Sequence, residues 1–233
     1  MKEVFDRYVE STLICDRPTD FSFCVYNTNY QSFLPTDKSA VILDIGVGVG
    51  GFLIFLRDLG YLNARGIDIS PSTIKSCQQK GLACELVEDT VKWLDMHVDE
   101  FDFIVLLDVI EHIPKGELIG FLSAIRRSLK EKGRLLIQTN NMQSQDSQLM
   151  RYGDITHHLG FCETSMRQVC FIAGFSQVDL FGLETLYAFR RSHYIRQTPF
   201  KAVRHLVFTC IRNFYWCFVR AMRRLNCNTG VST

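Results

Sequence analysis

The chain has 233 residues, of which 47% are hydrophobic and 22% are charged, and its formal net charge is +1. This makeup is typical of one globular domain with elaborations, and it excludes a disordered or collagen-like protein. The first residues carry acids and no uninterrupted apolar stretch, which argues against a secretory signal peptide and favours a cytoplasmic location.

An aromatic-rich segment, residues 1–39, opens the chain and ends in the turn formers Pro35, Thr36 and Asp37. We expect it to form a lid over the site of the domain that follows, residues 40–192. Its aromatic residues are equally suited to packing within the lid and to lining a ligand: Tyr26, Tyr30 and Phe33.

In residues 41–190 short apolar runs alternate with helical patterns, which is typical of βα units and a mostly parallel sheet. The predicted strands are 41–46, 64–69, 83–88, 101–109, 133–139, 176–182 and 184–190. The predicted helices are 50–60, 71–80, 90–96, 116–130 and 163–174. Ser70 and Pro71 form a good start for the second helix, and Gly174 is a plausible stop for the last.

A glycine-rich turn, in "VILDIGVGVGGF", follows the first strand. Such a turn lets a ligand approach the backbone and its free N–H groups. The spacing of Gly46, Gly48 and Gly51 fits GxGxxG, so a nicotinamide or flavin dinucleotide is a genuine alternative ligand, as is a turn that binds nothing. Asp44, at the end of the strand, would repel a pyrophosphate and suits a cationic ligand.

Two more acids follow the next two strands. Asp68 can accept hydrogen bonds from both ribose hydroxyls, and Asp89, with Thr90 beside it, can accept one from an adenine amino group. Three acids at consecutive strand ends predict an adenosine without phosphates and with a positive centre, namely S-adenosylmethionine. A nicotinamide-dependent oxidoreductase is disfavoured by Asp44 and by the lack of a Tyr/Lys pair for hydride transfer.

Five segments together resemble the ordered motifs of class I S-adenosylmethionine-dependent methyltransferases: "VILDIGVGVGGFL", "GIDISP", "VEDTVKWL", "FDFIVLLDVIEHIP" and "LKEKGRLLIQTNN". The resemblance implies a Rossmann-like α/β fold with a seven-stranded mixed sheet and helices on both faces. It implies that the turn from Asp44 through Gly46, Gly48 and Gly50 holds the methionine part of the cofactor. It further implies that Asp68, with Ile69, holds the ribose, that Asp89 and Thr90 hold the adenine, and that Asp108 borders the methyl-transfer site.

The element "THHLGF" resembles a segment of small methyltransferases of bacterial polysaccharide (O-antigen or capsule) biosynthesis, which implies a sugar hydroxyl of a glycan, or of its lipid-linked precursor, as acceptor. A positioned base assists attack by a hydroxyl, and histidine suits that task near neutral pH. We expect His157 to be the base and Asp154 to orient its ring. The neighbouring His158 is the other candidate, and a purely structural role for both histidines stays open.

Other acceptors and roles remain alternatives. A phenolic or quinone-precursor hydroxyl comes second and an amine third, and a cofactor-binding scaffold without turnover is the non-enzymatic alternative. Asp108, Glu111 and His112 match a segment that can hold a divalent cation in quinone-pathway O-methyltransferases. A structural role for that segment is favoured, and we expect no metal.

The C-terminal extension, residues 193–233, is basic. No acid follows Glu184, whereas nine of the 26 basic residues do. Val207, Ile211, Phe214 and Phe218 follow a helical spacing, which predicts an amphipathic helix too short in its apolar run to span a bilayer. It could lie on an anionic membrane at the inner face, pack on the protein, or form a homodimer contact; nucleic acid is not expected.

Overall fold

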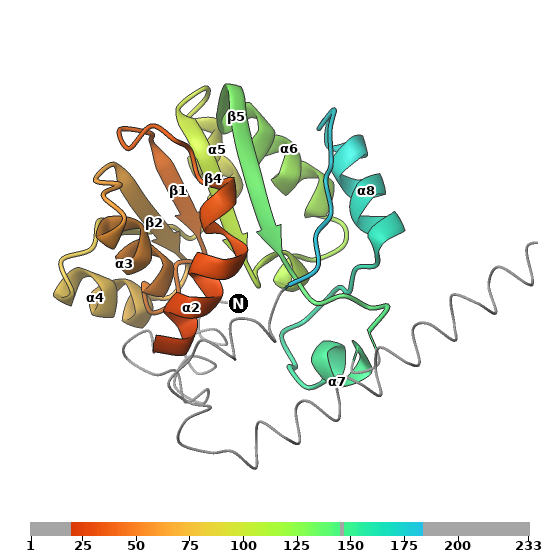
Figure 1. Ribbon diagram of the computed structural model, residues 1–233. Helices are drawn as coiled ribbons and strands as arrows, with labels where there is room; N and C mark the ends of the chain where they lie inside the picture. Colours follow the sequence, from red (N-terminus) through yellow and green to blue (C-terminus); the bar gives the residue numbers. More distant parts are fainter. Residues whose placement is uncertain (1–19, 145–146, 184–233) are drawn as a thin grey trace, which may run out of the picture.

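The computed structural model describes residues 20–144 and 147–183, and Figure 1 shows a sheet covered by helices on both faces. The sheet contains five strands in the order β3-β2-β1-β4-β5, and each neighbouring pair is parallel. The strands are β1 (Ile42–Ile45), β2 (Ala64–Asp68), β3 (Cys84–Leu86), β4 (Phe101–Leu107) and β5 (Leu129–Gln138). Each of these overlaps a strand predicted from the sequence.

Helices connect the strands, as parallel pairing requires. They are α2 (Asp20–Asn29), α3 (Gly51–Asp58), α4 (Pro71–Gln79), α5 (Thr90–Asp95), α6 (Leu118–Ser128), α7 (Ser147–Tyr152) and α8 (Glu163–Ile172), with the 3-10 turns η1 (Gln31–Phe33) and η2 (Ile110–His112). The predicted start of α4 is confirmed, because the Ser70 hydroxyl accepts from the Thr73 N–H at 3.4 Å and Pro71 is the first helical residue. The predicted stop is confirmed too, since Gly174 has a φ of +93°.

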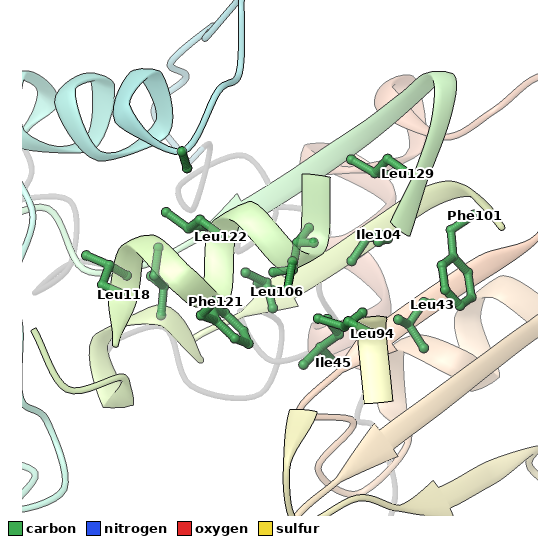
Figure 2. Packing of buried hydrophobic residues seen from close by; sticks show 14 of the residues in the cluster. Leu43, Ile45, Leu94, Phe101, Ile104, Leu106, Leu118, Phe121, Leu122 and Leu129 are labelled. Atoms are coloured by element: carbon green, nitrogen blue, oxygen red, sulfur yellow. The ribbon is translucent and has the colours of Figure 1, made fainter. Parts of the chain in front are cut away.

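One face of the sheet packs against α5, α6 and α8 (Figure 2). Leu43 and Ile45 of β1 and Ile104 and Leu106 of β4 are buried there against side chains of α6 such as Leu122. Because parallel strands are covered on both faces, their sequences are apolar almost throughout rather than alternating.

The other face packs against α2, α3 and α4. Aromatic rings join α2 to α3: the Tyr26 ring lies 5.4 Å from that of Phe52 and 5.6 Å from that of Phe55, and the Tyr30 ring lies 6.0 Å from that of Phe52. Aromatic pairs at these separations add to the stability that burial gives. This packing fixes α2 on the body of the domain.

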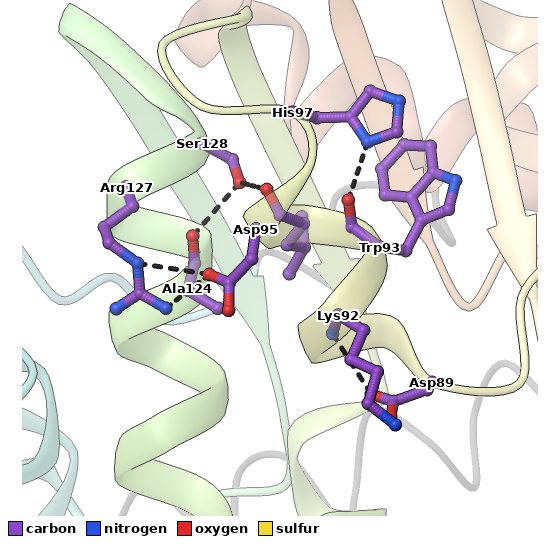
Figure 3. Close-up of polar contacts among 9 residues, drawn as sticks. Asp89, Lys92, Trp93, Asp95, His97, Ala124, Arg127 and Ser128 are labelled. Carbon is purple, nitrogen blue, oxygen red and sulfur yellow. Dashed lines mark hydrogen bonds and ion pairs between the residues drawn. The ribbon is translucent and has the colours of Figure 1, made fainter.

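Polar contacts join α5 to α6, as Figure 3 shows. Ser128, fully buried at the end of α6, donates to the carbonyl of Leu94 at 2.9 Å, or to that of Ala124 at 3.1 Å. Arg127 pairs with Asp95 at the surface. The buried hydroxyl thus has partners from both helices, which a buried polar group requires.

The predicted seven-stranded mixed sheet is corrected in part. The structure shows five parallel strands in the residues it describes, and residues 176–183 form no strand. The alternating pattern of "SQVDLFG" was compatible with a strand, but a strand also needs a neighbour for its hydrogen bonds, and this segment forms no ladder with β5. Residues 184–190 and the predicted C-terminal helix lie outside the described residues.

The short helix α7, between β5 and α8, was not among the helices predicted from the sequence. No helix within residues 20–144 and 147–183 combines the length and hydropathy needed to cross a bilayer.

Candidate functional site

The candidate site lies at the carboxyl ends of the parallel strands. The chain runs outward from β1 through β2 to β3 on one side, and returns to β4 on the other side of β1. In open parallel sheets this change of direction leaves a crevice beyond the strand ends, where ligands bind. The glycine turn after β1, Asp68 at the end of β2 and Asp108 after β4 all lie at this edge.

The glycine turn from Gly46 to Gly50 is held against β2. The N–H groups of Gly46 and Val47 donate to the carbonyl of Ile67 at 2.9 and 3.2 Å. Gly48 has a φ of +51°, and a Cβ atom added to it would meet no atom within 4 Å. The left-handed backbone therefore favours glycine at this position, and the space beside it is open to an approaching ligand.

Gly50 is required for a second reason. Its φ is +80°, and an added Cβ atom would lie 2.3 Å from Cδ1 of Leu82. We expect Gly50→Ala to destabilise the protein by about 1–2 kcal/mol through backbone strain and by about 1–3 kcal/mol more through overpacking. Gly60→Ala, at the other end of α3, is the matched control, since its φ is +89° and the space beside it is open. Urea unfolding should show the larger loss for Gly50→Ala; equal losses would contradict the steric explanation.

Asp44 and Asp68 lie on neighbouring strands beneath this turn. Asp44 is 2% exposed, and burial together with the charge of Asp68 raises its pKa to about 7. Asp68 accepts from the N–H of Gly48 at 3.1 Å with one oxygen and from the N–H of Ser70 at 2.9 Å with the other. A bound cation would stabilise both carboxylates and so lower the free-energy cost of ionising Asp44.

Tyr26 of α2 and Tyr30, which follows this helix, lie within electrostatic reach of these carboxyl groups. Burial, with the charges of Asp44 and Asp108, raises the pKa of Tyr26 to about 12. Burial and Asp108 also raise the pKa of Tyr30. The predicted lid segment therefore brings its aromatic residues to the ends of β1 and β4, and the same rings pack on α3.

The predicted adenine contacts lie near the edge of the sheet. Asp89 is exposed and caps α5: its carboxylate accepts from the Lys92 N–H at 3.1 Å and pairs with the Lys92 ammonium at 2.8 Å (Figure 3). These contacts lower the pKa of Asp89. Thr90 and Ile69 are half-buried. An adenine at this position would therefore share the Asp89 carboxylate with the first turn of α5.

Asp108 follows β4 in a left-handed conformation, with a φ of +55°. Such backbone strain in a residue other than glycine is concentrated at functional sites. The amide of Gln138, at the end of β5, donates to the Asp108 carboxylate at 2.7 Å. The Asp108 side chain is exposed, yet the partial loss of water around its carboxyl group raises its pKa. The hydrogen bond from Gln138 and the charge of His157 act in the opposite direction.

The charge of His157 acts on this acid and lowers its pKa. The side chain of His157 is 9% exposed, and its Nδ1 lies 2.9 Å from the carbonyl of Met150. Since a carbonyl only accepts, Nδ1 carries the proton and Nε2 is left as the basic nitrogen of the neutral ring. The ring of His112 lies 4.7 Å away, edge to face.

The predicted orienting role of Asp154 takes a different form. Its Oδ2 is 3.8 Å from Nε2 of His157, which is too long for a hydrogen bond. Its Oδ1 accepts instead from the N–H and the hydroxyl of Thr156, at 2.8 and 2.6 Å. The carbonyl of Met150 therefore orients the ring of His157.

The neighbouring His158 is the other candidate base. It is exposed, and its backbone N–H donates to the carbonyl of Glu111 at 2.8 Å while its carbonyl accepts from Arg151 at 2.7 Å. Successive residues of an extended segment face opposite sides, so the sequence predicted different environments for His157 and His158 but not which of them would be buried. The backbone of His158 ties its segment to η2.

Glu111 is the most buried acid on the acceptor side. It is 2% exposed, and burial raises its pKa to about 7. Burial and His157 lower the pKa of His112. Among the residues that the structure places, no group of three or more His, Cys, Asp or Glu side chains is arranged to hold a metal ion, so Asp108, Glu111 and His112 form no metal centre here.

Two residues in this site were missed by sequence reasoning. Thr156 bridges Asp154 and His112, and Gln138 contacts Asp108. Thr156 belongs to the quoted "THHLGF" element, so its position was a usable signal. Nothing in the sequence around Gln138 distinguished it from the rest of β5.

The donors and acceptors present fit S-adenosylmethionine. A buried acid at Asp44 and the charge of Asp108 suit the amine and sulfonium, and the open side of Gly48 admits the ligand. Lys80 reaches the turn from α4, but its ammonium donates to the carbonyl of Val49 at 2.9 Å. The turn thus presents more negative than positive charge, which disfavours a pyrophosphate.

Comparison with known proteins gives the following matches. A family model described as "Methyltransferase domain" matches residues 20–180. Cyclopropane-fatty-acyl-phospholipid synthase of Escherichia coli strain K12 is 28% identical over 107 residues, which are 45% of this chain and 27% of the synthase. This chain therefore spans about a quarter of the length of that relative.

Two solved structures share the fold. A SAM-dependent methyltransferase from Archaeoglobus fulgidus is 19% identical, with a TM-score of 0.53 over 88% of this chain and 87% of that one. The 1,6-didemethyltoxoflavin-N1-methyltransferase of Burkholderia thailandensis, solved with S-adenosylhomocysteine, is 18% identical, with a TM-score of 0.57 over 78% and 79%. None of these three matches supports the resemblance to polysaccharide methyltransferases.

Proposed function

Because the chain belongs to the methyltransferase-domain family of S-adenosylmethionine-dependent enzymes, we propose that it methylates a hydroxyl group of its acceptor. The first acceptor class is a sugar hydroxyl of a surface glycan or its lipid-linked precursor, and a phenolic hydroxyl is the second. The observation that carries the proposal is the 2.9 Å hydrogen bond between Nδ1 of His157 and the carbonyl of Met150, which leaves Nε2 of a neutral ring available to accept a proton.

The residues at the ends of β1 and β2 bind the cofactor in this proposal. Bound S-adenosylmethionine supplies a methyl group that its positive sulfur makes electrophilic. Asp44 and Asp108 offer negative charge to its cationic end, and the open space beside Gly48 lets the ligand approach the turn. Asp68 accepts from the ribose hydroxyls, and Asp89 with Thr90 lies where the adenine would reach the edge of the sheet.

The residues after β4 and β5 hold the acceptor. A hydroxyl group is a weak nucleophile until its proton is removed, and Nε2 of His157 accepts that proton as the new bond forms. Once it has accepted the proton, the ring of His157 is an imidazolium. The negative charges of Asp108 and Asp154 stabilise this protonated ring. Carboxylates and imidazoles are also suitable hydrogen-bond partners for the remaining hydroxyls of a sugar.

Binding and turnover can be tested separately on the full chain. Calorimetry should show binding of S-adenosylhomocysteine and no binding of NAD. The reverse result would support a dinucleotide as the ligand of this site. Radiolabelled methyl transfer should then occur to an oligosaccharide with free hydroxyls in preference to a catechol or a primary amine. Cofactor binding without transfer to any of the three would favour a scaffold, and preference for the amine would overturn the role given to His157.

A further inference from the structure

Thr156 joins Asp154 to His112 within the histidine cluster. The side chain is 8% exposed, and its Oγ1 lies 2.6 Å from Oδ1 of Asp154 and 2.9 Å from Nδ1 of His112. A carboxylate only accepts hydrogen bonds, and a hydroxyl has one proton to donate. Oγ1 of Thr156 therefore donates to Asp154 and accepts from the Nδ1–H of His112.

These hydrogen bonds also fix where Asp154 lies relative to His157. The N–H and the hydroxyl of Thr156 both bind Oδ1, and Oδ2 is left 3.8 Å from Nε2 of His157. A carboxylate that closed this gap would accept a hydrogen bond from Nε2 and so keep a proton on it. A nitrogen that already carries a proton cannot accept one from an acceptor hydroxyl.

We infer that Thr156 is a positioning residue that holds Asp154 away from His157, so that Nε2 of His157 remains the unprotonated nitrogen. The role of that nitrogen as a base rests on the proposed function, whereas the hydrogen-bond arrangement does not. His112 takes part as a support, because its ring is held by Thr156 and packs against the edge or face of His157.

The other ionisable groups around the cluster come from different elements. Asp108, after β4, faces His157, and Glu111 of η2 lies near both Asp108 and Asp154. The charge of His158 also reaches His112. A substitution at Thr156 leaves Asp108, Glu111 and His158 unchanged but also removes the hydrogen bond to His112, so a second substitution at Asp154 is needed to assign a change at His157 to that carboxylate.

The test is the protonation of the His157 ring in the full-length protein, read from its ring nitrogen chemical shifts by NMR at mildly alkaline pH. In the wild type and in Thr156→Ser, Nε2 should show the shift of an unprotonated nitrogen. In Thr156→Val, which loses the hydroxyl but keeps the branched shape, Nε2 should move to the range of a protonated nitrogen. In the double variant Thr156→Val, Asp154→Asn, the shift of Nε2 should return to the range of an unprotonated nitrogen.

Each outcome decides the inference. It is overturned if Nε2 of His157 stays unprotonated in Thr156→Val, or if Thr156→Ser behaves like Thr156→Val. Binding of S-adenosylhomocysteine by each variant shows that the fold is intact, and a valine variant that does not bind is replaced in the comparison by Thr156→Ala. Because the readout needs no acceptor, failure of methyl transfer and failure of this inference are separate results.

Discussion

Replacing His157 by alanine is expected to slow methyl transfer about ten- to ten-thousandfold, the range for loss of a general base. The physical reason is that the acceptor hydroxyl then keeps its proton as it attacks. Binding of S-adenosylhomocysteine should change little, because His157 is not among the residues proposed to hold the cofactor. The measurement is the initial rate of radiolabelled methyl transfer to the oligosaccharide at saturating cofactor.

His158→Ala is the matched control. This neighbour is exposed, and its contacts to Glu111 and Arg151 use only backbone atoms, which alanine retains. Its rate should stay within about twofold of the wild type, as expected for a surface substitution. A His157→Ala enzyme as fast as this control would remove His157 from the mechanism and leave positioning beside an activated methyl donor as the source of the rate.

Asp44→Asn should weaken binding of S-adenosylmethionine about ten- to hundredfold, because a charge-assisted interaction becomes a neutral one. The buried carboxyl also makes wild-type affinity depend on pH. Its pKa is raised to about 7 in the free protein, so below that value a proton must leave before the cation binds. Affinity should fall as the pH drops below about 7 in the wild type, and much less in Asp44→Asn.

The stability of the free protein should change in the opposite sense. A carboxyl whose folded pKa lies above its unfolded value of 3.8 stabilises the fold at low pH, and that stability is lost as the pH rises toward about 7. Asparagine cannot ionise, so Asp44→Asn should be more stable than the wild type above pH 7 while binding the cofactor less well. Glu111 contributes a similar pH dependence of stability to the wild type and to Asp44→Asn. The difference between their unfolding free energies therefore reports on Asp44. A variant that is less stable at every pH would contradict this account.

The sequence determined the local elements and the order of the cofactor residues. Buried parallel strands need continuous apolar runs, and helix ends need the residues found at Ser70 and Gly174, so both left clear patterns. Asp44, Asp68 and Asp89 were identified because each lies at or just after the end of a predicted strand, and parallel strands bring their carboxyl ends to one edge, whereas Asp108 was identified from the family resemblance. The number of strands was not determined in this way, since pairing depends on a neighbour that a single segment does not specify.

Only the tertiary structure decided how the acceptor side is arranged. The sequence placed His157 beside His158 without showing which one turns inward, because two adjacent residues of an extended segment face opposite ways and the rest of the fold selects one. The contact of Thr156 with His112 joins residues 44 positions apart. Such a hydrogen bond has no periodicity or spacing in the sequence, and it forms only when the segment after β5 packs against the turn after β4.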